Sequence, residues 1–215
     1  MCRIVHIGDV HWRGLQRHEE YRRVFEKLFE ELKVTKPDII MIAGDIVHNK
    51  TQGISPELID QLTWWFKEMV KICDVHVILG NHDGNLVNSY RQDAISPIIN
   101  AIDDDRIFLY KESGTYNFAP GYNWCVFSVF DEEGWSRVKP VEGEINIALF
   151  HGSVTGSVTD AGWELESELA VDFFKDYDYV MLGDIHRQQF LDYREYEIEI
   201  DEEDLHKYPN AEVIS

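Results

Sequence analysis

Polar side chains that can bind metal ions follow five short apolar runs of the chain. The junctions are Ile7-Gly8-Asp9-Val10-His11, Ile42-Ala43-Gly44-Asp45, Gly80-Asn81-His82-Asp83, Leu149-Phe150-His151-Gly152 and Leu182-Gly183-Asp184-Ile185-His186. Open α/β sheets bind ligands outside the carboxyl ends of their strands. Each apolar run is short enough to be a buried strand, so the five junctions are expected to meet at one edge of a sheet.

The donor types in these junctions indicate a divalent metal centre. Carboxylate, amide and imidazole groups suit hard or borderline cations such as manganese, and the absence of cysteine argues against structural zinc. Two such ions about 3.5–4 Å apart can hold the attacking and leaving oxygens of a phosphoryl displacement and activate a water molecule. A single Asp-x-His after a strand is more often a surface turn, so the prediction rests on the whole set.

The first half of the chain supplies three of the expected strands, at residues 3–7, 38–42 and 75–79. A helical apolar stripe between the first two runs from Tyr21 to Leu32 and stops near Pro37. A second helix begins at Ser55-Pro56-Glu57, where serine caps the helix and proline takes its first position. This βαβαβ order predicts parallel strands with right-handed crossovers.

The second half has mostly strand-like patterns. The expected elements are a helix at 93–102, strands at 107–110, 116–118, 124–130, 145–150, 179–182 and 190–200, and a helix at 164–174. We see no internal repeat and no domain boundary, so residues 1–215 are expected to form a single α/β domain. The stretch 205–215 contains no closing element, which suggests that the chain is the N-terminal part of a longer protein.

Composition narrows the setting and the substrates. The chain of 215 residues is 44% hydrophobic and contains no apolar run near the ~20 residues that a membrane span needs. Its three cysteines have no CxxC spacing, and a strand is expected directly after the N-terminus, so we expect no signal peptide and a cytoplasmic protein. The formal net charge of -20 argues against strong stand-alone affinity for nucleic acid.

The five junctions, in this order, resemble the motifs of the calcineurin-like metallophosphoesterase superfamily. Two segments, Gly44-Asp45-Ile46-Val47-His48 and Gly183-Asp184-Ile185-His186-Arg187, resemble its SbcD-type DNA repair nuclease branch. The resemblance is closest to bacteriophage recombination endonuclease subunits, which would place the chain in the host cytoplasm. It implies a metallophosphoesterase-type β-sandwich flanked by helices, with an exo- or endonuclease activity that hydrolyses DNA phosphodiester bonds by attack of metal-bound hydroxide.

The resemblance also implies a role for each junction residue. The implied ligands of two Mn²⁺ ions are Asp9, His11 and His186 for the first ion, Asp45 as the bridge, and Asn81, His151 and Asp184 for the second. The implied catalytic residues are His82 as the general acid, Asp83 to orient it, and His48 at the scissile phosphate. One residue departs from the pattern: Asp184 stands where many nucleases of this branch have histidine.

Partners and competing functions follow from the same resemblance. It implies an SbcC-type coiled-coil ATPase partner, a homodimer, and DNA as substrate. A second hypothesis is a metallophosphoesterase acting on small nucleotides or phosphoproteins, which the net charge favours and His48 disfavours. A third is a non-enzymatic binding subunit, against which His82 argues, because a protein without activity has no need for a general acid.

Overall fold

The first sheet of the protein is fully parallel, as expected. The computed structural model describes residues 2–48, 54–88 and 91–191. The strands β1 (Ile4–Ile7), β2 (Ile39–Ala43), β3 (Asp74–Ile78) and β4 (Ile107–Tyr110) lie in that order. Every residue of β2 is buried, in keeping with a parallel strand that is covered on both faces.

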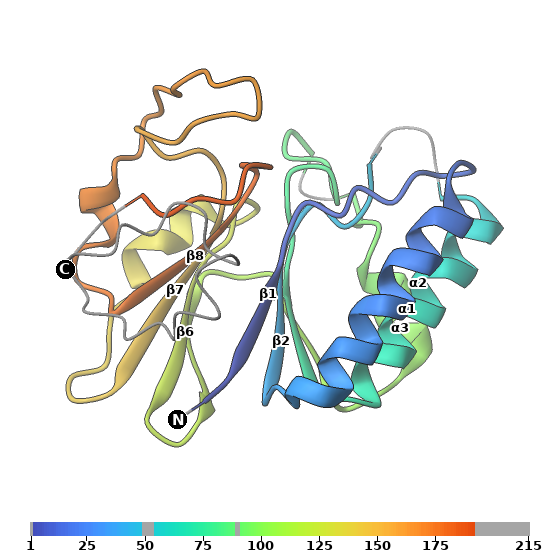
Figure 1. Ribbon diagram of the computed structural model, residues 1–215. Coiled ribbons are helices and arrows are strands. Elements are labelled where there is room, and N and C mark those ends of the chain that lie inside the picture. The colour runs from blue at the N-terminus through green and yellow to red at the C-terminus, as the bar shows by residue number, and fades with distance from the viewer. Residues whose placement is uncertain (1, 49–53, 89–90, 192–215) are drawn as a thin grey trace, which may run out of the picture.

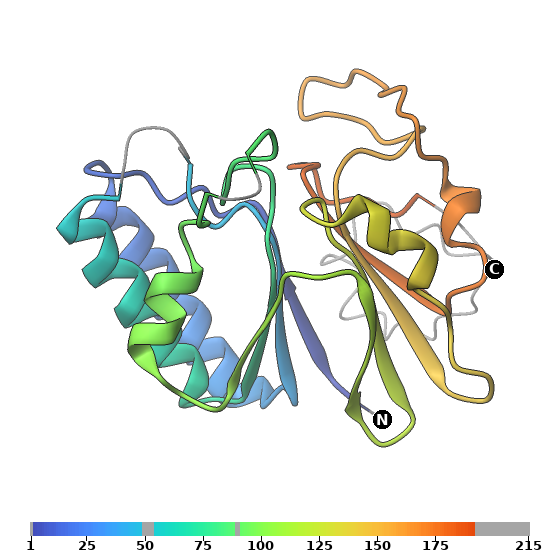
Figure 2. The same ribbon diagram turned by 180° about the vertical axis from the view of Figure 1, so that it is seen from behind.

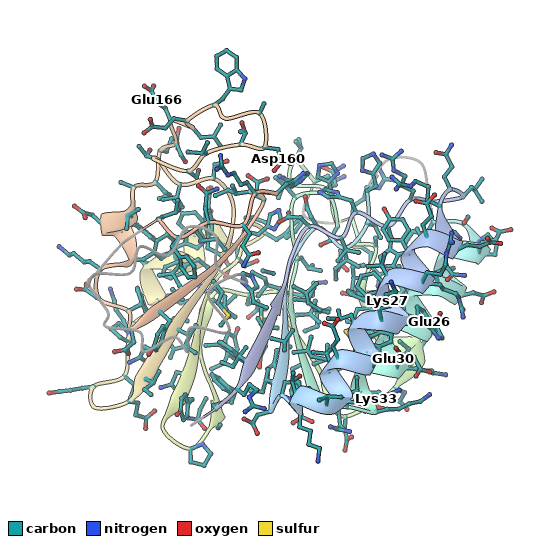
Figure 3. The ribbon with its side chains drawn as sticks, viewed as in Figure 1. Glu26, Lys27, Glu30, Lys33, Asp160 and Glu166 are labelled. Carbon is teal, nitrogen blue, oxygen red and sulfur yellow. The ribbon has the colours of Figure 1, made fainter. Side chains whose placement is uncertain are left out.

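Three helices cover one face of this sheet: α1 (His18–Thr35), α2 (Pro56–Val70) and α3 (Ser96–Ile102) (Figure 1). The predicted apolar stripe of α1 is buried at Phe25, Phe29 and Leu32. Its opposite face carries an exposed set of charges that points away from the sheet, comprising Glu26, Lys27, Glu30 and Lys33 (Figure 3). The helix therefore has the amphipathic character that its sequence predicts.

The second sheet is mixed. It contains β5 (Gly114–Ala119), β6 (Tyr122–Phe127), β7 (Ile145–His151) and β8 (Tyr179–Gly183), in that order. The pair β5–β6 is antiparallel, whereas β6–β7 and β7–β8 are parallel. Two 3₁₀ turns, η1 (Glu132–Arg137) and η2 (Val171–Phe174), lie on the side of this sheet that faces away from the first (Figures 1 and 2).

Apolar packing between the two sheets makes the molecule a sandwich. Met41 of the first sheet and Trp124 and Leu149 of the second are fully buried in this inner layer. A separate cluster fills the space between the first sheet and the helices, and a third lies under η1 and η2. The expected fold, an α/β sandwich flanked by helical elements, is confirmed.

Three predicted elements, besides the helix expected at 93–102, differ in the structure. The prediction of a helix at 164–174 was wrong, because only η2 is helical there. Exposed and less exposed residues alternate over residues 164–168, and the exposed ones are Glu164, Glu166 and Glu168. Such a period of two is typical of an extended chain. The strand expected at 124–130 ends at Phe127. Phe190 and Leu191 are not in a strand, and the rest of the strand expected at 190–200 lies outside the described residues.

The helix expected at 93–102 begins three residues later than predicted. Asp93 accepts hydrogen bonds from the backbone N–H groups of Ile95 (2.9 Å) and Ser96 (2.6 Å). An aspartate that accepts hydrogen bonds from the backbone two and three residues later forms a turn, and this turn precedes the first helical residue, Ser96. Asp93 therefore lies before α3 rather than within it.

Helices long and apolar enough to cross a membrane are absent from the part of the chain that the structure describes.

A buried histidine between the two sheets makes the stability of the fold pH-dependent. His76 is 3% exposed, and its Nδ1 accepts hydrogen bonds from Trp124 Nε1 (3.0 Å) and the Tyr110 hydroxyl (2.8 Å). Burial lowers the pKa of His76 from 6.5 to about 4. The neutral ring is therefore the form that the folded state favours, and protonation favours unfolding.

We predict that His76 costs the protein stability as the pH falls from about 6.5 toward 4. Between pH 7 and pH 5 the contribution is about 2 kcal/mol of unfolding free energy. His76→Gln keeps a hydrogen-bond acceptor but cannot titrate. From pH 7 to pH 5 the unfolding free energy of this variant should therefore fall by about 2 kcal/mol less than that of the unaltered protein. Urea unfolding at both pH values measures the difference; parallel pH profiles for the two proteins would contradict the prediction.

Candidate metal centre

Both sheets contribute to one cluster of polar side chains. The loops after β1, β2 and β3 meet the loops after β7 and β8 at the carboxyl ends of these strands (Figure 1). Four of the predicted ligands adopt positive φ: Asp9 (54°), His11 (50°), Asp45 (51°) and Asp184 (82°). This left-handed conformation is uncommon for residues other than glycine and concentrates at functional sites.

The Asp45 carboxylate lies at the centre of the cluster. It is 2% exposed, and imidazoles from three loops surround it. His151 Nε2 is 3.2 Å from Oδ1, and the Nε2 atoms of His11 and His82 are 3.5 and 4.0 Å from Oδ2. The backbone N–H of His82 also donates to Oδ1 (2.8 Å). Both oxygens of Asp45 therefore face imidazole nitrogens, and its role as a bridging ligand stays a prediction.

Three overlapping groups of donor atoms lie within 4.8 Å of one another and can hold a metal ion. They are Asp9, His11 and His186; His11, Asp45 and His82; and Asp9, Asp45 and His151. The first group contains the three residues expected for the first ion. Asp45 belongs to the other two groups, which is the arrangement that a shared ligand requires.

Asp184 and Asn81 lie beside this cluster on the His151 side. Asp184 Oδ1 is 3.9 Å from His151 Nε2 and accepts a hydrogen bond from Asn81 Nδ2 (3.3 Å). The backbone N–H of Asp184 donates to Asp9 Oδ1 (2.8 Å), which joins the β1 loop to the β8 loop. The residues expected for the second ion are therefore close together, and their roles as ligands remain predictions.

One of two unsatisfied buried nitrogens faces the Asp45 carboxylate, where a bound cation would fit. His11 Nδ1 and His151 Nε2 are buried and lack a hydrogen-bond partner within the described residues. His151 Nδ1 contacts the Ala43 carbonyl oxygen (2.7 Å) and must donate to it, so Nε2 faces the Asp45 carboxylate. A buried polar atom without a partner is costly, and a metal ion beside Asp45 would satisfy His151 Nε2.

The electrostatics of the two histidines differ. Burial is the largest influence on both, and it lowers the pKa of His11 to about 4. Burial also disfavours the charged form of His151, but contact with the Asp45 carboxylate outweighs it and raises the pKa of His151 to about 9. Without metal, a proton on His151 balances the buried carboxylate; a divalent cation would replace that proton.

His82 and His48 lie at the open side of the cluster. His82 Nδ1 donates to the carbonyl oxygen of His48 (2.6 Å), and the two rings stack with their centroids 6.1 Å apart. The ring centroid of His48 is 5.5 Å from that of His11. His48 therefore lies beside the donor groups, whereas His82 belongs to one of them but is less buried than Asp45.

Asp83 holds the loops rather than the histidine ring. Its fully buried carboxylate accepts hydrogen bonds from the backbone N–H groups of Val47 (3.0 Å) and Gly80 (2.9 Å). The loop of His48 and the loop of His82 are thereby joined. Any orientation of His82 by Asp83 passes through the backbone, and the direct partner of the imidazole is the His48 carbonyl.

A match to a known family decides the class of the protein. The family described as calcineurin-like phosphoesterase matches residues 2–188. The chain belongs to the calcineurin-like phosphoesterase family. The superfamily expected from the five junctions is thus confirmed, together with the phosphoesterase class of enzyme that the family description names.

Two curated relatives and one solved structure extend the comparison. Uncharacterized protein R555 of Acanthamoeba polyphaga mimivirus is 43% identical over 205 residues, covering 87% of this chain and 15% of that protein. The DNA double-strand break repair protein Mre11 of Methanopyrus kandleri is 25% identical over 212 residues, covering 86% of this chain and 44% of that protein. The chain therefore spans less than half the length of either relative.

The solved structure is the nuclease MPE of Pseudomonas putida. It is 20% identical, with a TM-score of 0.41 over 76% of this chain and 67% of that one. The similarity to Mre11 confirms the expected resemblance to a nuclease branch of the family.

Two residues near the centre escape prediction from the sequence. Ser153 donates from Oγ to Asp184 Oδ2 (2.8 Å), and Gln189 pairs with the backbone of Val158. Neither lies in a motif, and serine and glutamine are common in loops. Ser153 follows His151 by two residues, which is the only signal that the sequence offers.

Metal binding should release protons from His151. Because the pKa of His151 is about 9 in the metal-free protein, the ring is protonated at pH 7.5 and must lose that proton to bind an ion through Nε2. We expect about one proton to be released on manganese binding, with none from His11. Calorimetric titrations in buffers of different ionisation enthalpy measure this number, and a value near zero would show that His151 is already neutral.

Gly80 should be irreplaceable because Asp45 occupies the space of a side chain. A Cβ at Gly80 would lie 2.2 Å from Asp45 Oδ1 and 2.4 Å from the Asp45 backbone nitrogen. We predict that Gly80→Ala lowers the unfolding free energy by about 1–3 kcal/mol and weakens metal binding. Gly14→Ala is the control, because nothing lies within 4 Å of a Cβ there. Denaturant unfolding and metal titration should separate the two variants, and equal behaviour would refute the steric argument.

Proposed function

We propose that the chain is a dimetal-dependent phosphodiesterase that hydrolyses DNA phosphodiester bonds, as the nuclease subunit of a recombination or repair complex. The observation that carries the proposal is the shared carboxylate of Asp45, which lies among His11, His82 and His151. Donor groups on both sides of one buried carboxylate suit a pair of ions. His48 and His82 add two imidazoles at the open side, where a phosphodiester can reach them.

The proposed ligands are those predicted from the motifs: Asp9, His11, Asp45, Asn81, His151, Asp184 and His186. These residues would hold two divalent ions, for which we propose Mn²⁺, and the ions would supply positive charge to a phosphoryl oxygen and lower the pKa of a water molecule. The chain provides the rest of the chemistry. Because His82 Nδ1 donates to the His48 carbonyl, the ring turns Nε2 toward the cluster, and an imidazolium proton at Nε2 can pass to the leaving oxygen. His48 then contacts the phosphate from the adjacent loop.

DNA as the substrate is supported by the similarity to the repair protein Mre11. The charge of the chain suggests why a partner is needed: with a formal net charge of -20, the domain has little electrostatic attraction for a polyanion. In this proposal a coiled-coil ATPase of the SbcC type supplies the DNA grip, and two copies of the chain form a homodimer.

The second candidate function is hydrolysis of small nucleotides or phosphoproteins, and the loop after β7 favours it. Residues 153–169 contain no lysine or arginine, and all four of their acidic residues are exposed, namely Asp160, Glu164, Glu166 and Glu168. Asp160 and Glu166 mark this loop where it stands above the carboxyl ends of the strands (Figure 3). An acidic loop beside the centre repels a long polyanion more strongly than a small ester.

The proposal is tested by hydrolysis of three substrates with added manganese: a 3′-labelled linear duplex, a labelled single strand, and bis-p-nitrophenyl phosphate. We expect manganese-dependent cleavage of DNA, and we expect His82→Ala to reduce it by about 10²–10⁴-fold, because the leaving oxygen loses its proton donor. His6→Ala is the matched control, since His6 is an exposed histidine of β1 outside the three donor groups.

The outcomes separate the candidates. Cleavage of the small diester with no action on DNA, even after the ATPase partner is added, would favour the second function. Equal DNA cleavage by the His82→Ala and unaltered proteins would remove His82 from the mechanism. Failure to hydrolyse any of the substrates despite bound metal would point to a binding subunit.

A further inference from the structure

The segment that carries Asp184 and His186 has little regular structure of its own. It follows β8 directly, and residues 184–191 form neither helix nor strand. Asp184 has a positive φ of 82°, a conformation that a free chain would rarely adopt at a residue other than glycine. Yet this segment supplies one predicted ligand to each of the two metal positions. Something outside it must hold these ligands in place.

The loop formed by residues 153–169 is ordered by its own hydrogen bonds. Its two arms are joined by backbone bonds from Thr155 N to Leu169 O (2.8 Å) and from Leu165 N to Ser157 O (2.7 Å). Val154 at its base is 1% exposed and packs in the cluster under the second sheet. This loop therefore has the internal support that the ligand segment lacks.

Ser153, at the base of this loop, contacts the ligand segment at Asp184. Its hydroxyl donates to Asp184 Oδ2 (2.8 Å), while Asp184 Oδ1 faces Asn81 and His151. Ser153 is itself fixed, because its carbonyl oxygen accepts a hydrogen bond from the Ser167 hydroxyl (2.8 Å). Ser153 thus binds Oδ2 of Asp184, while Oδ1 faces the predicted metal ligands Asn81 and His151.

Gln189 makes the second connection, three residues after His186. Its Oε1 accepts a hydrogen bond from Val158 N (2.9 Å), and its Nε2 donates to Val158 O (2.9 Å). A side-chain amide that pairs with both backbone groups of one residue fixes its position in two directions. The same Nε2 also donates to the carbonyl oxygen of Arg187 (3.2 Å), adjacent to His186.

We propose that Ser153 and Gln189 are positioning residues that tie the 153–169 loop to residues 184–189, and that each serves a different metal position. Ser153 orients Asp184 and so supports the ion held with Asn81 and His151. Gln189 fixes the backbone that carries His186 and so supports the ion held with Asp9 and His11. The inference rests on the dimetal centre of the proposed function. Groups that orient metal ligands typically change metal affinity by 10–100-fold when removed.

The test is calorimetric titration of metal-free protein with Mn²⁺, together with electron paramagnetic resonance of the loaded pair. Ser153→Ala should weaken one of two binding steps by about tenfold or more and reproduce the titration of Asp184→Asn. Gln189→Ala should weaken the other step and reproduce His186→Gln. Both should reduce the signal of the coupled manganese pair at limiting metal.

Three matched variants complete the experiment. Ser153→Thr keeps the hydroxyl and should restore binding, whereas Ser136→Ala removes an exposed serine of η1 and should change nothing. Gln188→Ala removes the exposed neighbour of Gln189 and should also be silent. The metal-free melting temperatures of Ser153→Ala and Gln189→Ala should match that of the unaltered protein.

Two results would overturn the assignment. One is unchanged manganese binding in both variants while the unaltered protein binds two ions, which leaves the proposed function intact. The other is equal weakening of both steps by either variant, which would indicate a general structural effect. Fewer than two ions on the unaltered protein would instead count against the dimetal centre and would remove the basis of this assignment as well.

Discussion

Burial of the Asp45 carboxylate is the constraint on which the site depends. A carboxylate that is 2% exposed must be balanced by positive charge, because an isolated buried anion is very costly. In the metal-free chain that balance comes from His151, whose pKa the contact raises to about 9 despite burial. His11 and His82 approach the other oxygen but come from different loops. The carboxyl ends of β1, β3 and β7 thus each bring one histidine to the Asp45 carboxylate, and a pair of cations would balance its charge.

Close approach of the loops requires small residues as well as charge. The ideal Cβ of Gly183 would lie 2.1 Å from the Ala43 carbonyl oxygen, the group that receives the His151 N–H. The same loops place four of the predicted ligands in left-handed conformations, at a cost of order 1 kcal/mol or more each. Bringing the donor atoms together therefore lowers the stability of the fold, and the packing of the buried strands beneath the loops offsets this cost. Activity and stability are in tension at this edge of the sandwich.

Much of the architecture could be predicted because its signals are local. The buried stripe of α1, the cap at Ser55 and the apolar strands each follow from side-chain type and spacing. The site could be located because Asp9, His11, Asp45 and the other junction residues follow strands that end at one edge. The apolar residues of 164–174 fit both periods, so the sequence favours a helix there, and only contacts with the rest of the loop select the extended form before η2. Ser153 and Gln189 could not be found because their partners, Asp184 and Val158, are 31 residues away in sequence.

The position of the centre across both sheets has a mechanical consequence. Asp9, Asp45 and Asn81 belong to loops of the first sheet, while His151 and Asp184 belong to loops of the second. Direct links such as Asp184 N–H to Asp9, and His151 to the Ala43 carbonyl, already cross this boundary. Ions bound among these residues would hold the two sheets together at this end of the sandwich. The described cysteines are all free and form no covalent cross-link between the sheets. Metal loading would then resist separation of the two layers, so that catalytic readiness and resistance to unfolding rise together with the supply of the ion.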